Sequence, residues 1–294
     1  MKGAVKEIHR PVLVSEVIDQ LRIRPEGKYI DGTIGAGGHT EEILKKLGEK
    51  GRVLGIDRDP EILNVVREKM EVPLYHGSFE DLDQACDLLG TRQVDGILLD
   101  LGISSLQVDR PERGFSFMKE ASLDMRMDPS DRTTAEEIIR KSSERELERI
   151  LRDYGEEPFA RKIAAAIVER RRRRPIDTTT ELAEVISKAI PVWPHRLHPA
   201  TRTFQALRIA VNRELDRLKI FLERAPAVLA SGGRLVILSY HSLEDRIVKQ
   251  SFVRWEMEGV LRRITKKPIR PSEAEILENP RARSAKMRVA EKME

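Results

Sequence analysis

Residues 30–39 read Ile-Asp-Gly-Thr-Ile-Gly-Ala-Gly-Gly-His, an apolar segment that opens into a glycine-rich turn. Further along, Val53–Asp57 is a second apolar run, and it also ends in an acid. A strand, a glycine turn and a helix leave bare backbone N–H groups on the floor of a pocket. An acid at the tip of the next strand can then accept hydrogen bonds from a ribose. The pairing predicts a site for a nucleoside cofactor; the alternative is a glycine turn with no ligand.

The spacing of the glycines distinguishes between cofactors. The dinucleotide fingerprint G-x-G-x-x-G needs a third glycine at position 40, where the chain has Thr40. Gly35, Gly37 and Gly38 instead form a wider turn that follows Asp31. A pyrophosphate prefers a helix N-terminus with no anion nearby, whereas a strand-end acid suits a cofactor that carries positive charge. The turn therefore favours S-adenosylmethionine, with its sulfonium and ammonium groups, over a dinucleotide.

Composition excludes several classes of protein. The chain has 294 residues, of which 40% are hydrophobic and 35% charged, so a folded globular protein is expected. The single cysteine, Cys86, excludes an internal disulfide and a multi-cysteine zinc site. No group of histidines and acids has a metal-ligand spacing, so no metal is expected. The sequence starts without an export signal and has no apolar run of membrane-spanning length, which predicts a cytoplasmic protein with no membrane partner.

The first hundred residues alternate between strand and helix patterns. Strands are expected at 29–31, 52–57, 73–76 and 94–100, and helices at 15–21, 40–47 and 61–70. Pro60 occupies the first position of the third helix, where proline is favoured. This rhythm predicts an α/β fold with a parallel sheet and right-handed crossovers.

The rhythm then breaks after Asp100. The next comparable strand, 234–240, follows the expected helix stop Ser231-Gly-Gly, roughly 130 residues later, whereas a crossover needs only a few dozen. Helices are expected between them at 134–152, 158–174, 178–190 and 203–222. We therefore expect an all-helical domain at 112–212, inserted into a cofactor-binding domain formed by 1–111 and 213–294. The final segment, 285–292, alternates like an edge strand.

Positive charge is unevenly distributed. The net charge is only +4, yet the chain from Arg246 to its end has 13 Lys and Arg against 7 Asp and Glu. Inside the insert, one helix closes on five consecutive arginines: Arg170, Arg171, Arg172, Arg173 and Arg174. The helix dipole accounts for one or two such cations, and a solvated charge run is the alternative. We predict contacts with RNA phosphates from this run, and from Arg202 as a phosphate clamp.

Ligands of such sheets bind beyond the carboxyl ends of the strands, where the strand order reverses. This rule gathers Asp31, Asp57, Asp100 and the pair Tyr240-His241 around one cleft. Phe79 follows the third strand and could pack on an adenine, or it could be a core aromatic beneath a loop. In the insert, Phe115 and Phe117 suit stacking on a flipped base, although a hydrophobic hinge between domains is an equal alternative.

Nine longer motifs are distributed along nearly the whole chain. They are His9-Arg-Pro-Val-Leu13, Tyr29-Ile-Asp-Gly-Thr-Ile-Gly-Ala-Gly-Gly-His-Thr40, Gly55-Ile-Asp-Arg-Asp-Pro60, Asp95-Gly-Ile-Leu-Leu-Asp-Leu-Gly-Ile-Ser-Ser105, Glu112-Arg-Gly-Phe-Ser-Phe-Met118, Leu123-Asp-Met-Arg-Met-Asp128, His198-Pro-Ala-Thr-Arg-Thr-Phe-Gln205, Ser239-Tyr-His-Ser-Leu-Glu-Asp-Arg246 and Asn279-Pro-Arg-Ala-Arg283. Through these motifs the chain resembles the bacterial 16S ribosomal RNA cytosine-N4 methyltransferase family.

The resemblance implies a Rossmann-like class I methyltransferase sheet and a cytoplasmic enzyme that uses S-adenosylmethionine. Its substrate would be N4 of one cytidine in the decoding region of 16S rRNA, within the small ribosomal subunit. Carried over by position, the cofactor contacts of the family fall on Gly37, Gly38, His39, Asp57, Phe79, Asp100 and Gln107. The sequence of the glycine turn itself predicts Asp31 as a further cofactor contact.

The catalytic residues are harder to assign. Many amino-group methyltransferases carry Asp/Asn-Pro-Pro-Tyr/Phe after the fourth strand, whereas this chain has Asp100-Leu-Gly-Ile-Ser-Ser. The aromatic that grips the base must therefore come from elsewhere. We expect Asp100 or nearby backbone to accept the N–H of the amine, with Ser104, Tyr240 and His241 as further candidates. Two other functions remain open: an NAD(P)-dependent oxidoreductase and a non-catalytic RNA-binding assembly factor.

Overall fold

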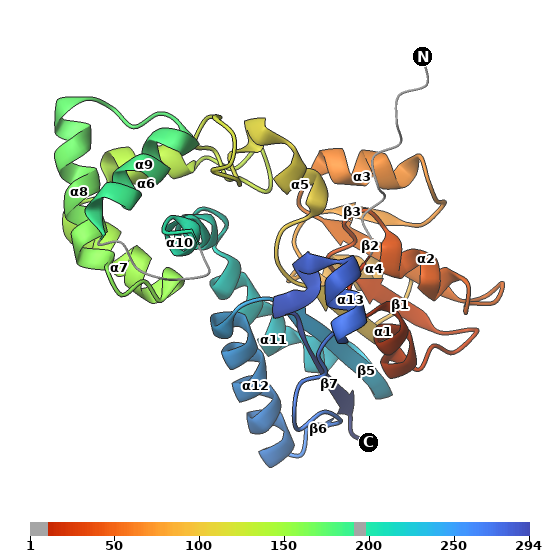
Figure 1. The fold of residues 1–294 in the computed structure, drawn as a ribbon. Coiled ribbons are helices and arrows are strands. Elements are labelled where there is room, and N and C mark those ends of the chain that lie inside the picture. Colours follow the sequence, from red (N-terminus) through yellow and green to blue (C-terminus); the bar gives the residue numbers. More distant parts are fainter. Residues whose placement is uncertain (1–10, 191–197) are drawn as a thin grey trace. The chain divides into compact units, whose positions relative to one another are not determined.

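The structure, a computed structural model, describes residues 11–190 and 198–294 (Figure 1). The chain divides into two compact units. Met1–Gly102 and Leu215–Glu294 form the first, and Ile103–Glu214 forms the second. The first two residues of the His9–Leu13 motif lie outside the described residues. No helix within the described ranges is long and apolar enough to cross a membrane.

The first unit is built on a seven-stranded sheet in the order β3-β2-β1-β4-β5-β7-β6. The strands are β1 (Lys28–Asp31), β2 (Arg52–Asp57), β3 (Leu74–His76), β4 (Val94–Asp100), β5 (Leu229–Ser239), β6 (Leu261–Arg263) and β7 (Lys286–Lys292). β3, β2, β1, β4 and β5 are parallel, while β7 runs antiparallel to β5 and to β6. The four strands predicted in the first hundred residues are confirmed, and so is the α/β fold.

Two predictions at the second half of the sheet are wrong. Ser231-Gly-Gly does not stop a helix, because it lies inside β5. Leu229 pairs with Val94 and Arg234 pairs with Gly96, so the additional residues of β5 bulge out of the ladder. β7 is also not an edge strand, because β6 pairs with its outer side. Both of its faces are covered: Val289 lies in the core, and the buried Arg288 donates to Asp245.

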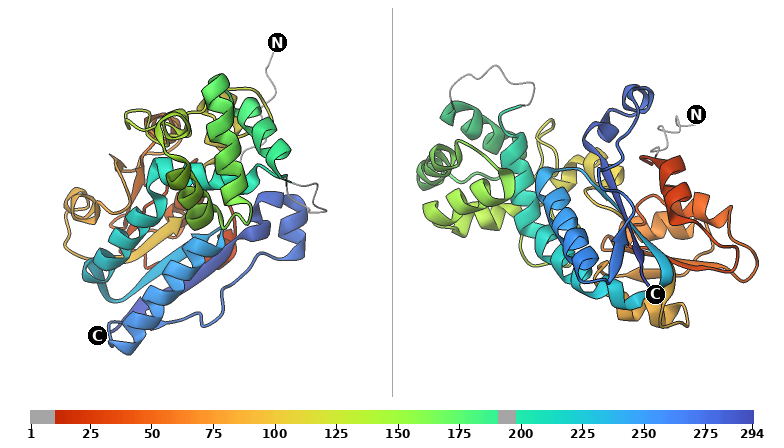
Figure 2. Two further views of the ribbon diagram at one scale, coloured as in Figure 1. Left: turned by 90° about the vertical axis from the view of Figure 1, so that its left-hand side faces the viewer. Right: turned by 90° about the horizontal axis from the view of Figure 1, so that it is seen from below.

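Helices cover both faces of this sheet (Figures 1 and 2). They are α1 (Val14–Leu21), α2 (Gly38–Leu44), α3 (Pro60–Arg67), α4 (Leu82–Leu88), α11 (Glu214–Val228), α12 (Ser242–Met257) and α13 (Glu273–Glu278), with a 3₁₀ turn at Pro280–Ser284. The three predicted helices of this half are confirmed, with shifted ends. Pro60 stands at the first position of α3, and Asp59 caps the backbone N–H of Glu61. α4 was not predicted.

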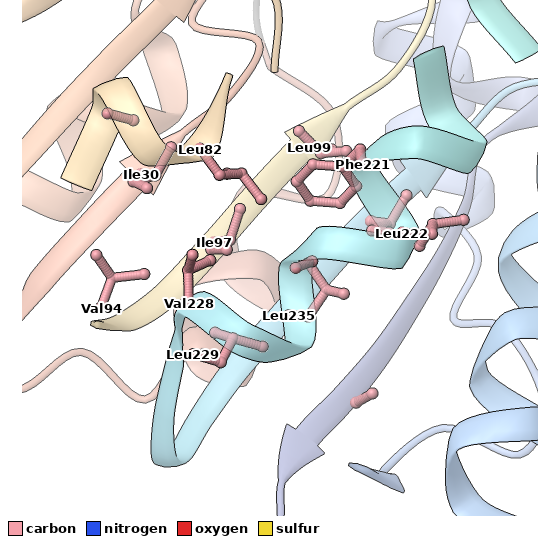
Figure 3. Packing of buried hydrophobic residues seen from close by; sticks show 14 of the residues in the cluster. Ile30, Leu82, Val94, Ile97, Leu99, Phe221, Leu222, Val228, Leu229 and Leu235 are labelled. Atoms are coloured by element: carbon pink, nitrogen blue, oxygen red, sulfur yellow. The ribbon is translucent and has the colours of Figure 1, made fainter. Parts of the chain in front are cut away.

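The largest core of the first unit lies between the sheet and the helices α4, α11 and α12. In Figure 3, the ring of Phe221 of α11 lies beside Leu99 of β4, and Leu222 of α11 and Leu235 of β5 belong to the same core. The preceding residue of β4, Leu98, belongs instead to the core on the opposite face, with α1 and α2. Successive residues of β4 are thus buried on both sides, which explains why a covered parallel strand is apolar without alternation.

The second unit is helical apart from one isolated β-bridge, within the residues that the structure describes. It contains α5 (Ser105–Asp109), a 3₁₀ turn (Pro111–Arg113), α6 (Ala135–Lys141), α7 (Glu144–Gly155), α8 (Ala160–Arg173), α9 (Thr179–Ala189) and α10 (Thr201–Asn212). The predicted insert, 112–212, lies within this unit. Its own core joins Leu147 and Leu151 of α7, Ile163 of α8 and Phe204 of α10.

Two of the predicted helices in this region are broken. The helix expected at 134–152 divides into α6 and α7, because Ser143 forms a new capping box with Glu146. The helix expected at 203–222 divides into α10 and α11 at Arg213, whose φ of 53° is left-handed. The helix expected at 178–190 is confirmed as α9, which begins with a capping box of Thr178 and Glu181.

Candidate functional site

Three acids stand at the carboxyl ends of three neighbouring strands. Asp31 ends β1, Asp57 ends β2 and Asp100 ends β4, and β1 pairs with both other strands. The strand order reverses between β1 and β4, which is where doubly wound sheets bind their ligands. The topology therefore brings the three predicted acids to one edge of the first unit.

Asp31 is held by two threonines. Its side chain is 1% exposed, and its Oδ2 accepts a hydrogen bond of 2.7 Å from the hydroxyl of Thr40. Its Oδ1 accepts from the backbone N–H of Thr33 at 3.3 Å. Burial raises the pKa of the Asp31 carboxyl, and the Thr40 bond opposes this shift. Thr40, which in the sequence only marks a missing glycine, thus orients the first acid of the site.

The glycine turn has the conformation that its sequence demands. Gly35 and Gly37 have φ angles of 51° and 84°, in the left-handed region that favours glycine. A Cβ at Gly38 would lie 2.7 Å from Cγ of Pro11, so the backbone of the turn is closely approached there. Gly38 begins α2, and its neighbour His39 is 5% exposed.

Asp57 closes the turn from the neighbouring strand. Its Oδ2 accepts from the backbone N–H of Gly35 at 3.1 Å, and its Oδ1 accepts from that of Asp59 at 3.0 Å. Burial nevertheless raises the pKa of Asp57 to about 6, because these bonds only partly replace water around the carboxylate.

Asp100 is contacted by an aromatic hydroxyl and an imidazole. Its Oδ1 accepts from the hydroxyl of Tyr240 at 2.6 Å, and its Oδ2 lies 3.7 Å from Nδ1 of His39. Nε2 of His39 lies 2.9 Å from the carbonyl oxygen of Val12, which can only accept, so Nε2 carries a hydrogen. Burial raises the pKa values of Asp100 and Tyr240. The hydroxyl of Thr33 accepts from the backbone N–H of Asp100.

The three carboxylates share an unusual electrostatic position. Within the described residues, none of Asp31, Asp57 and Asp100 forms an ion pair with a lysine or arginine. Each has a pKa that burial raises, so each costs free energy while it is ionised and unliganded. A ligand that brings a positive charge and hydroxyl donors to this edge would relieve that cost.

The model of one protein family matches nearly the whole chain: that of the MraW methylase family, over residues 6–293. The chain belongs to this family. It is 49% identical to the ribosomal RNA small subunit methyltransferase H of Caldicellulosiruptor bescii over 304 aligned residues, which cover 97% of this chain and 99% of that protein. It is 50% identical to the protein of the same name from Methylococcus capsulatus, over 95% of this chain and 99% of that one.

Membership of a methylase family fits the sheet described above. The Rossmann-like methyltransferase sheet predicted from the sequence is the sheet that this MraW methylase has, with β7 inserted antiparallel between β5 and β6. A methylase is also not an oxidoreductase, so the NAD(P) alternative is set aside by the family.

Phe79 of this MraW methylase packs against the core of the first unit, which is one of the two alternatives predicted for it. Its ring meets Phe221 edge to face, with 5.7 Å between the centroids, and it packs against the core of the first unit. The side chain is nevertheless only half-buried, which leaves part of the ring exposed after β3. The contact with an adenine stays a prediction.

The predicted catalytic residue His241 has a structural role in the first unit. It is the N-cap of α12, where its Nδ1 accepts from the backbone N–H of Glu244 at 3.5 Å. Its Nε2 lies 3.1 Å from Oε1 of Glu244, so both ring nitrogens face the same residue. The buried Glu244, which sequence reasoning missed, also accepts from the backbone N–H of Tyr240. The signal was the spacing of His241 and Glu244, which matches a capping box.

The other predicted cofactor and catalytic contacts, Ser104 and Gln107, lie in the second unit. They form the capping box of α5: the hydroxyl of Ser104 accepts from Leu106 N, and Oε1 of Gln107 accepts from Ser104 N. Gln107 is 4% exposed. Their predicted roles stay predictions.

The arginine run at the end of α8 is engaged in bonds within the second unit. Four of its five members have partners. Two donate to backbone carbonyls: Arg170 to those of Arg174 and Pro175, and Arg171 to those of Ile139 and Ser142. The other two form ion pairs, Arg173 with Glu169 and Arg174 with Glu181. Arg202 likewise donates to the carbonyl of Glu156 at 2.7 Å. The run thus connects α8 to the ends of α6 and the start of α9, and its binding to RNA stays a prediction.

The two phenylalanines of the insert pack within the second unit. Phe115 and Phe117 are half-buried against its core. The ring of Phe117 stacks on His198 at 4.6 Å and meets Phe204 edge to face at 5.0 Å. These contacts lie within the second unit, so the stacking of a flipped base and the hydrophobic hinge between domains both stay predictions.

Proposed function

We propose that this MraW methylase transfers a methyl group from S-adenosylmethionine to N4 of one cytidine in the decoding region of small-subunit (16S) ribosomal RNA. The observation that carries the proposal is the edge with three carboxylates around a glycine turn, none of which pairs with a lysine or arginine among the described residues, in a chain of a methylase family. The names of the relatives support RNA of the small subunit as the substrate. The ribosome as target also supports a cytoplasmic location.

The residues of the first unit suit this methyl donor. S-adenosylmethionine, when bound, supplies an electrophilic methyl group on a sulfonium. We assign the ribose hydroxyls to Asp57, the cationic methionyl end to Asp31, and the adenine to Phe79. Gly37, Gly38 and His39 would line the turn, where a side chain on Gly38 would meet Pro11. Gln107 of the second unit completes the assignment that the family resemblance implies.

Asp100 is proposed to act on the incoming cytosine. The lone pair of N4 is delocalised into the ring, so a carboxylate that accepts its N–H makes it a better nucleophile. As the bond between N4 and the methyl carbon forms and the methyl–sulfur bond of the donor breaks, N4 must lose one proton, and Oδ2 of Asp100 would accept it. Tyr240 fixes Oδ1 through its hydroxyl, and His39 stands beside Oδ2. The remainder of the acceleration would come from positioning the two reactants.

The second unit is proposed to recognise the RNA substrate. Arg172 is the exposed member of the run that has no partner among the described residues, and it is therefore the member best placed to contact a phosphate. The remaining four arginines would have to exchange their internal bonds for phosphates, which makes them weaker candidates than the sequence suggested.

Labelled methyl transfer tests the proposed function directly. Small subunits from cells that lack the modification are incubated with the protein and methyl-labelled S-adenosylmethionine, and the labelled nucleotide and atom are mapped. We expect one methyl group per subunit, on N4 of one cytidine. No transfer to subunits or to free 16S rRNA would instead favour a non-catalytic RNA-binding assembly factor, and label on another atom would contradict the N4 assignment.

The pKa of Asp57 predicts how binding of the methyl donor depends on pH. The carboxylate accepts hydrogen bonds from the ribose, whereas the protonated acid does so poorly. Because the pKa of Asp57 in the free protein is about 6, affinity should be constant above pH 7 and fall as the pH drops through 6. We expect about tenfold weaker binding at pH 5 than at pH 7.5, measured by calorimetry. An Asp57→Asn variant should lose this dependence; a wild-type affinity independent of pH would contradict the role.

A further inference from the structure

One segment at the margin of the first unit is strongly basic. Residues 261–270, Leu-Arg-Arg-Ile-Thr-Lys-Lys-Pro-Ile-Arg, contain five cations and no acid. The segment begins as β6 and then continues beside β7 toward α13. In Figure 1 the blue chain that leaves β6 continues toward α13.

Two anchors fix this segment to the sheet. At the first, the N–H of Ile264 donates to the carbonyl of Val289, and the hydroxyl of Thr265 accepts from the N–H of Val289. At the second, Ile269 and Met287 exchange two backbone hydrogen bonds of 2.9 and 2.8 Å. Both isoleucines pack against the core on that face.

Between and after the anchors, three cations project outward. Lys266, Lys267 and Arg270 are exposed, and prolines at 268 and 271 limit the backbone around them. We call residues 264–270 the arch. It is short and anchored at two points, so its charged side chains lose little conformational freedom when they bind a ligand.

The charges of the arch are not neutralised by neighbours. Arg262 forms an ion pair with Glu291, and Arg263 with Glu256. Asp245 forms ion pairs with both Lys286 and Arg288. In contrast, Lys266, Lys267 and Arg270 form no hydrogen bond or ion pair within residues 11–190 and 198–294. Lys266 lies near enough to Glu256 to lower the pKa of that acid, but Glu256 is already bound to Arg263.

The segment leads toward the edge that carries the site. Ile269 is paired with Met287, and Met287 in turn pairs with Leu238, two residues before Tyr240. The chain from Ile264 to Ile269 therefore runs along β7 toward the carboxyl end of β5, where the hydroxyl of Tyr240 holds Asp100. A polyanion on the arch would extend toward the same edge of the sheet.

We propose that Lys266, Lys267 and Arg270 form a phosphate-binding margin that holds the backbone of the RNA substrate beside the methyl-transfer site. This inference rests on the proposed function for the identity of the RNA, and it adds a contact surface on the first unit. The margin offers charges without partners on a fixed arch, whereas the arginine run of α8 offers charges that are mostly bound. Phosphate contacts contribute most of the sequence-independent affinity of such complexes.

The salt dependence of RNA binding tests the margin. The variant Lys266→Gln/Lys267→Gln/Arg270→Gln is compared with the matched control Lys46→Gln/Lys50→Gln/Arg92→Gln. The control removes three exposed cations from the loops that precede β2 and β4, at the opposite end of the strands. The Kd for a transcript of small-subunit rRNA is measured between 50 and 300 mM salt (roughly the range in which counterion release is resolved).

We expect the margin variant to bind the transcript about 10- to 100-fold more weakly at ~0.1 M salt, with its salt slope reduced by about 2. The control should keep nearly the wild-type RNA affinity and salt slope. Both variants should unfold at the wild-type temperature and bind S-adenosylmethionine as the wild type does. An unchanged slope in the margin variant, or an equal loss in the control, would overturn the proposal. If the wild type binds RNA through the margin but transfers no methyl group, the proposed function fails and the margin stands.

Discussion

Asp100→Asn is expected to reduce the rate of methyl transfer by about 10²- to 10⁴-fold, the usual contribution of a positioned general base. Asparagine has the shape of aspartate, and its carbonyl can still accept from the hydroxyl of Tyr240, so the strand end should keep its geometry. Its amide nitrogen, however, cannot take the proton that N4 must lose. The loss should therefore appear in the chemical step.

Single-turnover transfer to unmodified small subunits, at saturating S-adenosylmethionine, separates this effect from a loss of cofactor affinity. The affinity itself is measured in parallel, because Asp100 is also an expected cofactor contact. Asp83→Asn, an exposed acid on α4, serves as the matched control. Turnover of Asp100→Asn within about threefold of the wild type would remove Asp100 from the proton transfer.

The parts of the fold that the sequence predicts are those with local causes. β2 and β4 have the predicted bounds because each is a run of apolar residues that ends at an acid. The rule that ligands bind at the carboxyl ends of parallel strands then predicts that Asp31, Asp57 and Asp100 lie at one edge of the sheet. Local pattern and topology were enough for this half of the site.

The errors have long-range causes. The break at Arg213 depends on a left-handed residue that helix propensity does not reveal, and the bulge of β5 depends on its pairing with β4. The sequence predicts that the arginine run is available to bind phosphates, because it does not reveal the backbone acceptors of the run. Among them are the carbonyls of Ile139 and Ser142, about thirty residues away in the chain. Backbone acceptors leave no mark in a sequence, so a count of charges overstates how many are available.

Hydroxyl groups that orient the acids were missed for a similar reason. Thr40 donates to Asp31, and the hydroxyl of Thr33 accepts from the backbone of Asp100. Both threonines lie in the glycine motif, whose pattern is defined by its glycines alone. A polar residue that replaces an expected glycine at the start of a helix is the signal that could have identified Thr40.

Asp57→Asn is expected to weaken the binding of S-adenosylmethionine by about 100-fold without loss of stability in the free protein. The ionised carboxylate is the stronger acceptor for ribose hydroxyls, and hydrogen bonds to charged groups contribute about 1.5–3 kcal/mol each. In the free protein the same charge is unfavourable, because burial raises the pKa of Asp57 from its ordinary value to about 6. Folding therefore takes up a proton as the pH falls below 6, and the charge lowers stability at every pH above that value.

The asparagine removes that cost and keeps an oxygen that can accept from the backbone N–H of Gly35 or Asp59. At pH 7.5 the variant should thus unfold at the wild-type temperature or above it. The gain in the free energy of unfolding should be about 1–2 kcal/mol at most. At pH 4 the advantage should disappear, since the wild-type carboxyl is then protonated. Calorimetric titration and thermal unfolding at both pH values, with Asp83→Asn as control, measure the two effects. Affinity within threefold of the wild type, or a variant less stable at pH 7.5, would show that Asp57 supports the glycine turn rather than the ribose.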